Sequence, residues 1–404
     1  MISEKIRSVA LDYHEYPTPG KTCIGLTKPT ETQADLALAY SPGVAEPVVE
    51  IARNPQDAYR YTNKGNLVGI ISNGTAVLGL GNTGALSSKP VMEGKAVLFK
   101  RLANIDVFDI EVDCEDPDTF IEIVARIAPT FGGINLEDIK APECFKIEQA
   151  LRERVDIPLM HDDQHGTAMV VAAGLLNALE LQNKKISDVQ IVCAGAGAAG
   201  IASIELLVQL GANPQNIIML DRSGVIHDER NDLNDLKRKF ALRTMKRTFA
   251  DGLIDADVFI GVSGPGVLTA DMVKTMANKP VVFALSNPTP EILPELAFQT
   301  RKDLIMATGR SDYPNQVNNA LAFPYIFRGA LDTRATCINH AMQLAAVHAI
   351  KDLAKELAPQ EVRQCYPEER IFDFGPQYIL PKMLDLRLCE KVSSAVALAA
   401  IRSK

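Results

Sequence analysis

The chain has 404 residues, a formal net charge of −8 and an ordinary globular composition, with 47% hydrophobic and 23% charged residues. Because a single hydrophobic core stops growing beyond roughly 250–300 residues, we expect two domains. The acidic balance argues against a nucleic-acid groove or an anionic membrane surface as the main partner, since either needs clustered Lys and Arg.

The distribution of cysteines and apolar residues bears on the compartment. The seven cysteines are scattered and never spaced C-x-x-C, so neither a disulfide framework nor a zinc knuckle is predicted. Charged residues interrupt residues 1–11, and no stretch reaches the roughly 18 apolar residues that a membrane span needs. We therefore expect a cytoplasmic protein with no membrane and no nucleic-acid partner.

The first part of the chain is predicted to be an α/β domain spanning residues 1–165. Short apolar runs alternate there with polar or Gly-rich turns, as in buried strands separated by helices. The predicted strands are residues 67–72 (LVGIIS), 77–80 (VLGL), 105–112 (IDVFDIEV), 133–136 (GINL) and 157–160 (IPLM). A helix is expected at 117–127, and an Ala- and Leu-rich helix at 167–181 is expected to link the two domains.

Residues 166–385 are predicted to form a Rossmann-type domain with a doubly wound parallel sheet. From residue 189 the pattern is strand, glycine turn, helix and strand. Further strands are predicted at 256–262, 281–285 and 304–306, with a helix at 269–277. Residues 332–357 and 389–401 read as helices, and residues 386–404 are assigned to a C-terminal helix.

A glycine-rich turn predicts the dinucleotide site. Gly195, Gly197 and Gly200, with Ala198 and Ala199, form GAGAAG directly after a strand and at the start of a helix. Such glycines permit a tight turn, close approach of the backbone to the pyrophosphate and packing of helix on strand. Asp221 ends the next strand, where an acid can bind ribose hydroxyls and favours NAD, whereas Arg222 could pair with the 2′-phosphate of NADP.

Two carboxylate pairs predict a metal site in the first domain. Glu137 and Asp138 follow one strand, and Asp162 and Asp163 follow another. Acids at the ends of neighbouring strands converge on a hard cation, and oxygen ligands favour Mg²⁺ or Mn²⁺. His161 and His165 flank the second pair, so zinc is the alternative, and helix capping or solvated acids are the alternative without any metal.

Several single residues are candidates for chemistry, each with a plainer structural interpretation. Lys95 precedes an apolar run that would lower its pKa, as a neutral base requires, although a lysine with only its stem buried fits the spacing better. Tyr40 precedes a Ser-Pro-Gly turn and could be a core tyrosine. The amides of Asn287, and of Asn319 beside Asn318, could bind a carboxylate or simply form turns.

Taken together, these segments resemble the malic enzyme family, particularly its bacterial members. The resemblance covers nearly the whole chain in order and rests on the segments LAYSPGVAEP, SNGTAVLGLGNTGALSSKPVMEGKAVLFK, GGINLEDIKAPECF, HDDQHGTA, GAGAAG, LSNPTPE and GRSDYPNQVNNALAFPYIFRGALD. It implies a metal-dependent oxidative decarboxylation of L-malate to pyruvate and CO₂ with reduction of NAD or NADP. It also tips the choice slightly toward NADP and implies a homo-oligomer, at least a dimer.

The same resemblance implies a role for each candidate. Tyr40 would be the general acid, Lys95 the general base and Asp162 the carboxylate that orients the lysine. The metal ligands would be Glu137, Asp138 and Asp163. Asn287 and Asn319 would contact the substrate carboxylate, and Asn287 is also expected beside the cofactor.

The chain departs from the larger, eukaryotic-type members at one point. It has Ala76 where they have an arginine, so malate would be held differently, for example by backbone amides of residues 79–84. In the bacterial subgroup a phosphotransacetylase-like domain often follows, and it is expected to be absent here or to have been removed. The remaining alternatives are a plain hydroxy-acid or amino-acid dehydrogenase and a non-catalytic dinucleotide-sensing protein.

Overall fold

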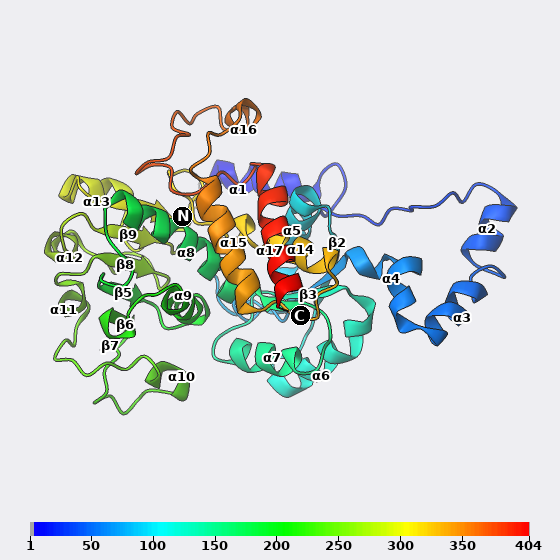
Figure 1. Ribbon diagram of the computed structural model, residues 1–404, viewed down its shortest axis with the longest axis horizontal. Coiled ribbons are helices and arrows are strands. Elements are labelled where there is room, and N and C mark those ends of the chain that lie inside the picture. The colour runs from blue at the N-terminus through cyan, green and yellow to red at the C-terminus, as the bar shows by residue number, and fades with distance from the viewer. Residues whose placement is uncertain (1–3, 404) are drawn as a thin grey trace.

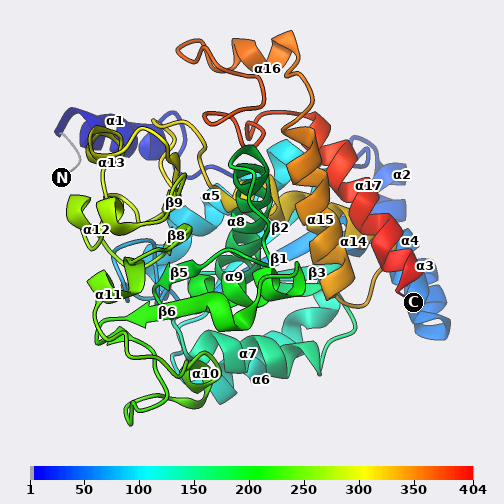
Figure 2. The same cartoon turned by 60° about the vertical axis from the view of Figure 1, so that its left-hand side comes forward.

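The computed structural model describes residues 4–403, in two parallel-sheet units joined by a long helix, α8 (Figures 1 and 2). Residues 1–3 and 404, the outermost ends of the predicted domains, lie outside the described part. The helices are α1 (Glu4–Glu15), α2 (Gln33–Ala39), α3 (Ala45–Arg53), α4 (Ala58–Tyr61), α5 (Ala85–Ala103), α6 (Pro117–Ile127), α7 (Glu143–Arg152), α8 (Asp162–Leu181), α9 (Ala198–Gln209), α10 (Asp235–Arg238), α11 (Phe249–Leu253), α12 (Ala270–Thr275), α13 (Pro294–Thr300), α14 (Phe323–Asp332), α15 (His340–Leu353), α16 (Gln360–Gln364) and α17 (Arg387–Arg402). None of these helices is long and apolar enough to cross a membrane.

The first sheet has four parallel strands in the order β2-β1-β3-β4. They are β1 (Leu67–Ser72), β2 (Asp106–Glu111), β3 (Gly133–Leu136) and β4 (Leu159–His161). Burial of β1, β3 and β4 on both faces explains their apolar runs, whereas the edge strand β2 is partly exposed and carries three acids. The strand predicted at residues 77–80 is wrong, because this segment is a tight turn closed by a single bridge from Val77 to Gly81.

The second sheet is doubly wound, as predicted, with the order β10-β9-β8-β5-β6-β7. Its strands are β5 (Ile191–Ala194), β6 (Ile217–Asp221), β7 (Gly224–Val225), β8 (Val258–Gly261), β9 (Val281–Ala284) and β10 (Ile305–Thr308). All pairs are parallel except β6 with the short β7. The strand order reverses at β5, between β6 and β8, and ligands of such sheets bind at this switch point.

The C-terminal helices return to the first sheet. Phe99 of α5 packs against Phe323 and Phe327 of α14, with ring centroids 4.8 and 5.5 Å apart. The helix predicted at residues 332–357 begins too early, because α14 ends at Asp332, the chain then turns, and α15 spans His340–Leu353. Asn339 caps α15 by accepting from the backbone N–H of Met342. One hydrophobic core therefore runs through both units. The boundary predicted near residue 165 falls inside α8.

The N-terminal segment forms an arm that projects from the body (Figure 1). An extended stretch after α1 leads to α2 and α3, and neither helix buries a residue. Tyr40 lies at the end of α2, with 76% of its surface exposed.

Candidate active site

Three acids converge at the carboxyl edge of the first sheet. β3 and β4 are neighbours in parallel register, with Leu136 opposite His161, so the residues that follow them meet at one edge. Glu137, Asp138 and Asp163 each offer a carboxylate oxygen, and these oxygens lie within 4.8 Å of one another. The structure thus brings together the three residues predicted to be metal ligands.

The environment of these acids fits a hard cation. Burial and then the neighbouring Asp163 raise the pKa of Asp138 to about 8, and burial raises the pKa of Glu137 well above its usual value despite the contact with Lys95. The Oδ2 atom of Asp138 is buried and has no hydrogen-bond partner among the described residues. Mutual repulsion and an unpartnered oxygen are both relieved by a divalent cation with oxygen ligands.

Lys95 lies beside these acids on α5, which places it against the sheet. Its Nζ atom is 3.0 Å from Glu137 Oε1, contacts Asp162 Oδ2, and lies 4.4 Å from the ring centroid of Phe323. The expectation of a lowered pKa is wrong for this state of the site. Burial does lower the pKa of Lys95, but Asp162, Glu137 and Asp163 outweigh burial and raise it.

Asp162 links the lysine to a second segment of the chain. Its Oδ2 atom accepts from Lys95 Nζ and, at 2.6 Å, from the side-chain amide of Asn319. The candidate orienting acid and the candidate substrate amide are thus in contact although 157 residues separate them. Asn135, within β3, was not among the predicted site residues, yet its amide donates to Glu137 Oε2 at 2.9 Å.

The two histidines do not complete a zinc site among the described residues. His165 Nε2 lies 2.9 Å from Glu148 Oε1 on α7, behind the acids. His161 Nε2 is 3.7 Å from Asp163 Oδ2 and makes no hydrogen bond within the described part of the chain. Among residues 4–403, the set of possible metal ligands consists of the three acids, which favours Mg²⁺ or Mn²⁺ over zinc.

The glycine turn between β5 and α9 has the shape of a dinucleotide cradle. Gly195 has a φ of +114°, and a Cβ there would lie 2.5 Å from the carbonyl oxygen of Val262. A Cβ on Gly200 would lie 1.9 Å from the carbonyl oxygen of Gly195, whereas a Cβ on Gly197 would meet nothing within 4 Å. Ala198 and Ala199 begin α9, so the positive end of this helix faces the open space at Gly197.

Asp221 ends β6 as predicted, but its carboxylate is already engaged. Arg230 donates to both of its oxygens at 2.8 and 3.1 Å, Lys237 donates at 2.7 Å, and the backbone N–H of Ser223 donates at 3.0 Å. Burial raises the pKa of Asp221, but the bonds from Arg230 and Lys237 outweigh it and lower the pKa. Arg222 is exposed beside this cluster. Arg230 and Lys237 were missed because their pairing depends on loop geometry.

One cavity of about 570 Å³ joins the two halves of the site. From the first unit it is lined by Ala76, Leu78, Gly79, Lys95, Glu137, Asp138 and Asp163, and from the second by Ala199, Ser263, Gly264, Ser286, Asn287, Asn318 and Asn319. Asp162 lies directly behind it, in contact with Lys95 and Asn319. Of the glycine stretch 79–84, only Gly79 lines the cavity, and Tyr40 does not.

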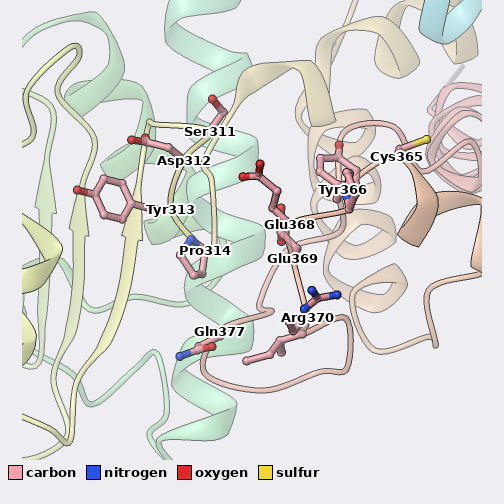
Figure 3. A pocket seen from close by; sticks show the side chains of 12 residues that line it. Ser311, Asp312, Tyr313, Pro314, Cys365, Tyr366, Glu368, Glu369, Arg370 and Gln377 are labelled. Carbon is pink, nitrogen blue, oxygen red and sulfur yellow. The ribbon is translucent and has the colours of Figure 1, made fainter.

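A second cavity of about 570 Å³ lies outside this site (Figure 3). It lies between the loop after β10, which contributes Ser311 and Tyr313, and the segment after α16, which contributes Tyr366 and Arg370. Neither the three acids nor the glycine turn reaches it. This second cavity is therefore separate from the candidate active site.

Comparison with known proteins decides the family. The model of the malic enzyme N-terminal domain matches residues 20–152, and that of the malic enzyme NAD binding domain matches residues 164–373. The chain belongs to the malic enzyme family. Its fold agrees with that assignment, since the crystal structure of malic enzyme from Pyrococcus horikoshii Ot3 has a TM-score of 0.89 at 43% identity, covering 98% of this chain and 91% of that one.

Two relatives in the malic enzyme family differ in length. The NADP-dependent malic enzyme of Halomonas elongata is 63% identical, and the match covers 98% of this chain and 94% of that protein. The NADP-dependent malic enzyme of Escherichia coli K12 is 58% identical, and the match covers all of this chain but 53% of that protein. The chain thus corresponds to nearly the full length of one relative and to about half of the other.

Proposed function

We propose that the chain catalyses the oxidative decarboxylation of L-malate to pyruvate and CO₂, coupled to reduction of NADP and dependent on Mg²⁺ or Mn²⁺. The observation that carries this proposal is the single cavity shared by the three acids, Lys95 and the end of the glycine turn. We also propose a cytoplasmic location, which the scattered cysteines support because they match no disulfide framework.

Each candidate residue has a part in this reaction. When bound, the cation would supply positive charge at the C2 oxygen of malate and the dinucleotide would accept hydride from C2. Lys95 would remove the C2 hydroxyl proton, held in place by Asp162, while Asn287 and Asn319 would hold a substrate carboxylate. Loss of the C4 carboxylate as CO₂ leaves an electron pair at C3. Tyr40 would then donate a proton to C3 to give pyruvate.

The raised pKa of Lys95 is compatible with a role as base. Glu137 and Asp163 are two of the acids that raise it, and both belong to the proposed metal-binding set. A divalent cation bound there offsets their charge and favours the neutral amine.

We propose that Tyr40 acts in the site of a second copy of the chain. Tyr40 lies on the projecting arm and does not line the cavity of its own chain. The arm exposes Ile24, Leu26 and Leu38 by 85, 80 and 75%, and clustered exposed apolar side chains mark a contact surface.

The rim of the cavity offers a matching surface. Leu78, which lines the cavity, and the nearby Leu80 and Leu86 are 70, 74 and 84% exposed. In a two-fold dimer, the arm of each chain could cover the rim of the other and both apolar surfaces would be buried at once. This arrangement would supply the missing proton donor and would make a dimer the smallest active unit.

The preference for NADP is proposed from the state of Asp221. Four donors occupy its carboxylate, so it is poorly placed to accept from ribose hydroxyls. Arg222 and Lys237 add positive charge beside it, which suits a 2′-phosphate. Family membership alone leaves the cofactor open, because a 53% identical relative from Rhizobium meliloti is named an NAD-dependent malic enzyme.

Replacing Arg222 by alanine is expected to lower kcat/KM for NADP about tenfold, the effect of losing one charged hydrogen bond, and to change kcat/KM for NAD less than about twofold. Steady-state kinetics with both cofactors measures this. Arg238→Ala is the matched control, because Arg238 is also exposed but its guanidinium donates to the carbonyl oxygen of Leu233 at 3.1 Å instead of to Asp221. Equal losses with NADP and NAD would contradict a contact with the 2′-phosphate.

The experiment that tests the proposed function is a malate assay with NADP and NAD in parallel, with and without Mn²⁺. We expect reduced cofactor and CO₂ in equal amounts, faster turnover with NADP, and loss of turnover when EDTA removes the metal. NADPH binding, followed by its fluorescence, should survive EDTA, because the glycine turn does not share the acids. Cofactor reduction without CO₂ would instead indicate a plain dehydrogenase, and no turnover would leave a dinucleotide-binding protein.

A further inference from the structure

Glu291 is a buried carboxylate to which the proposed reaction assigns no role. It follows β9 and precedes α13 and is 0% exposed. No Lys, Arg or His forms an ion pair with it in the described part of the chain. A charge in such a place must be stabilised by hydrogen-bond donors alone, which makes their identity informative.

The donors to Glu291 come from two loops at the carboxyl edge of the second sheet. The backbone N–H of Ser263, after β8, donates to Oε1 at 3.0 Å. The backbone N–H of Ser286, after β9, donates to Oε2 at 3.1 Å, and its hydroxyl donates to Oε1 at 2.6 Å. One carboxylate therefore joins the loops that follow two adjacent strands.

The space for this carboxylate depends on a glycine. A Cβ on Gly261, the last residue of β8, would lie 2.4 Å from Cδ of Glu291. Any larger side chain at this position would push the carboxylate away from both loops. The absence of a side chain at Gly261 therefore leaves the room that the Glu291 carboxylate occupies at this sheet edge.

Both loops line the active-site cavity. Residues 262–265 and 285–287 form its wall on the side of the dinucleotide domain. Asn287, next to Ser286, is packed closely on two sides. A Cβ on Gly79 would lie 2.6 Å from the backbone oxygen of Asn287, and a Cβ on Gly309 would lie 2.6 Å from its side-chain nitrogen. With so little free space, the position of Ser286 determines that of Asn287.

We propose that Glu291 is a positioning residue, which holds the loops after β8 and β9 so that their backbone and Asn287 face the bound dinucleotide and substrate. This inference rests on the proposed function for the identity of the ligands. It requires no contact between Glu291 and either ligand. Its effect should therefore fall on binding more than on the chemical step.

The test is Glu291→Gln, which keeps the size of the side chain but turns one acceptor into a donor that faces N–H groups. The dissociation constant for NADPH, measured by its fluorescence, is expected to rise about tenfold. KM for NADP and for malate should rise similarly, whereas kcat at saturation should stay within about threefold. Glu295→Gln is the matched control, because it makes the same change four residues further on, at a carboxylate that accepts a hydrogen bond from Tyr313. It should leave the NADPH dissociation constant, both KM values and kcat unchanged.

A second variant covers the case in which Glu291→Gln does not fold. Ser286→Ala removes only the hydroxyl donor and keeps both backbone bonds, so a rise of about threefold in the NADPH dissociation constant is expected. An unchanged dissociation constant in whichever of the two variants folds, or a loss of kcat without any change in KM, would overturn the positioning role. NADPH binding needs no malate turnover, so failure of this inference is distinguishable from failure of the proposed function.

Discussion

Replacing Lys95 by alanine is expected to lower kcat for malate roughly a thousandfold, within the range that a positioned general base contributes. The physical reason is the position of its Nζ atom, which contacts Asp162 and lies 3.0 Å from Glu137 inside the shared cavity. No other lysine of the part of the chain that the structure describes lines that cavity. Steady-state assays with saturating NADP and Mn²⁺ measure the loss, and fluorescence should show NADPH binding unchanged.

Lys100→Ala is the matched control for this experiment. Lys100 lies on the same helix, pairs with Asp106 and has 58% of its side chain exposed, so its removal should cost less than about 1 kcal/mol of stability and no activity. Near-native turnover of Lys95→Ala would refute the assignment of the base. A loss shared by both variants would point to damage to α5 instead.

Combining two inactive chains in one dimer is expected to restore about half of the wild-type activity. Chains carrying Tyr40→Phe or Lys95→Ala can be co-expressed with different tags, and the mixed dimer can be isolated by two affinity steps. If Tyr40 acts in the partner's site, one site of the mixed dimer contains both native residues and the other contains neither. Tyr40→Phe alone should slow protonation at C3 more than the oxidation step.

A tyrosine that folds back into its own chain gives the opposite result. Each site of the mixed dimer would then carry one of the two substitutions, and activity would stay at the level of the parent variants. A monomeric but active wild-type protein would contradict the proposal in the same way. Leu38→Asp on the arm provides an independent check, because it should weaken the dimer without touching the cavity of its own chain.

Local patterns predicted much of the fold. The buried strands β1 and β3 and the helix α6 were placed at their observed bounds, since apolar runs and flanking turns are local properties. The doubly wound sheet followed from the glycine turn between two strands. The strand predicted at 77–80 failed because its apolar residues belong to an exposed turn, where Leu78 and Leu80 are 70 and 74% exposed.

Electrostatic properties could not be predicted in the same way. The apolar neighbours of Lys95 in the sequence suggested a lowered pKa, but the carboxylates that raise it come from the ends of β3 and β4. Asp221 was expected to bind ribose hydroxyls, yet Arg230, in a later loop, and Lys237, on α10, pair with it. Coulombic interactions depend on distance in space, and separation along the chain says little about that distance.

The sequence by itself determined the family, the bounds of several strands and helices, and the residue types able to bind a cation and a dinucleotide. These depend on short-range patterns and on ordered motifs. Only the tertiary structure decided that β3 lies beside β4, that Asn319 reaches Asp162, and that Tyr40 stands outside its own cavity. Each of these is a contact, or the lack of one, between segments far apart in the chain, and such contacts are set by packing of the whole core.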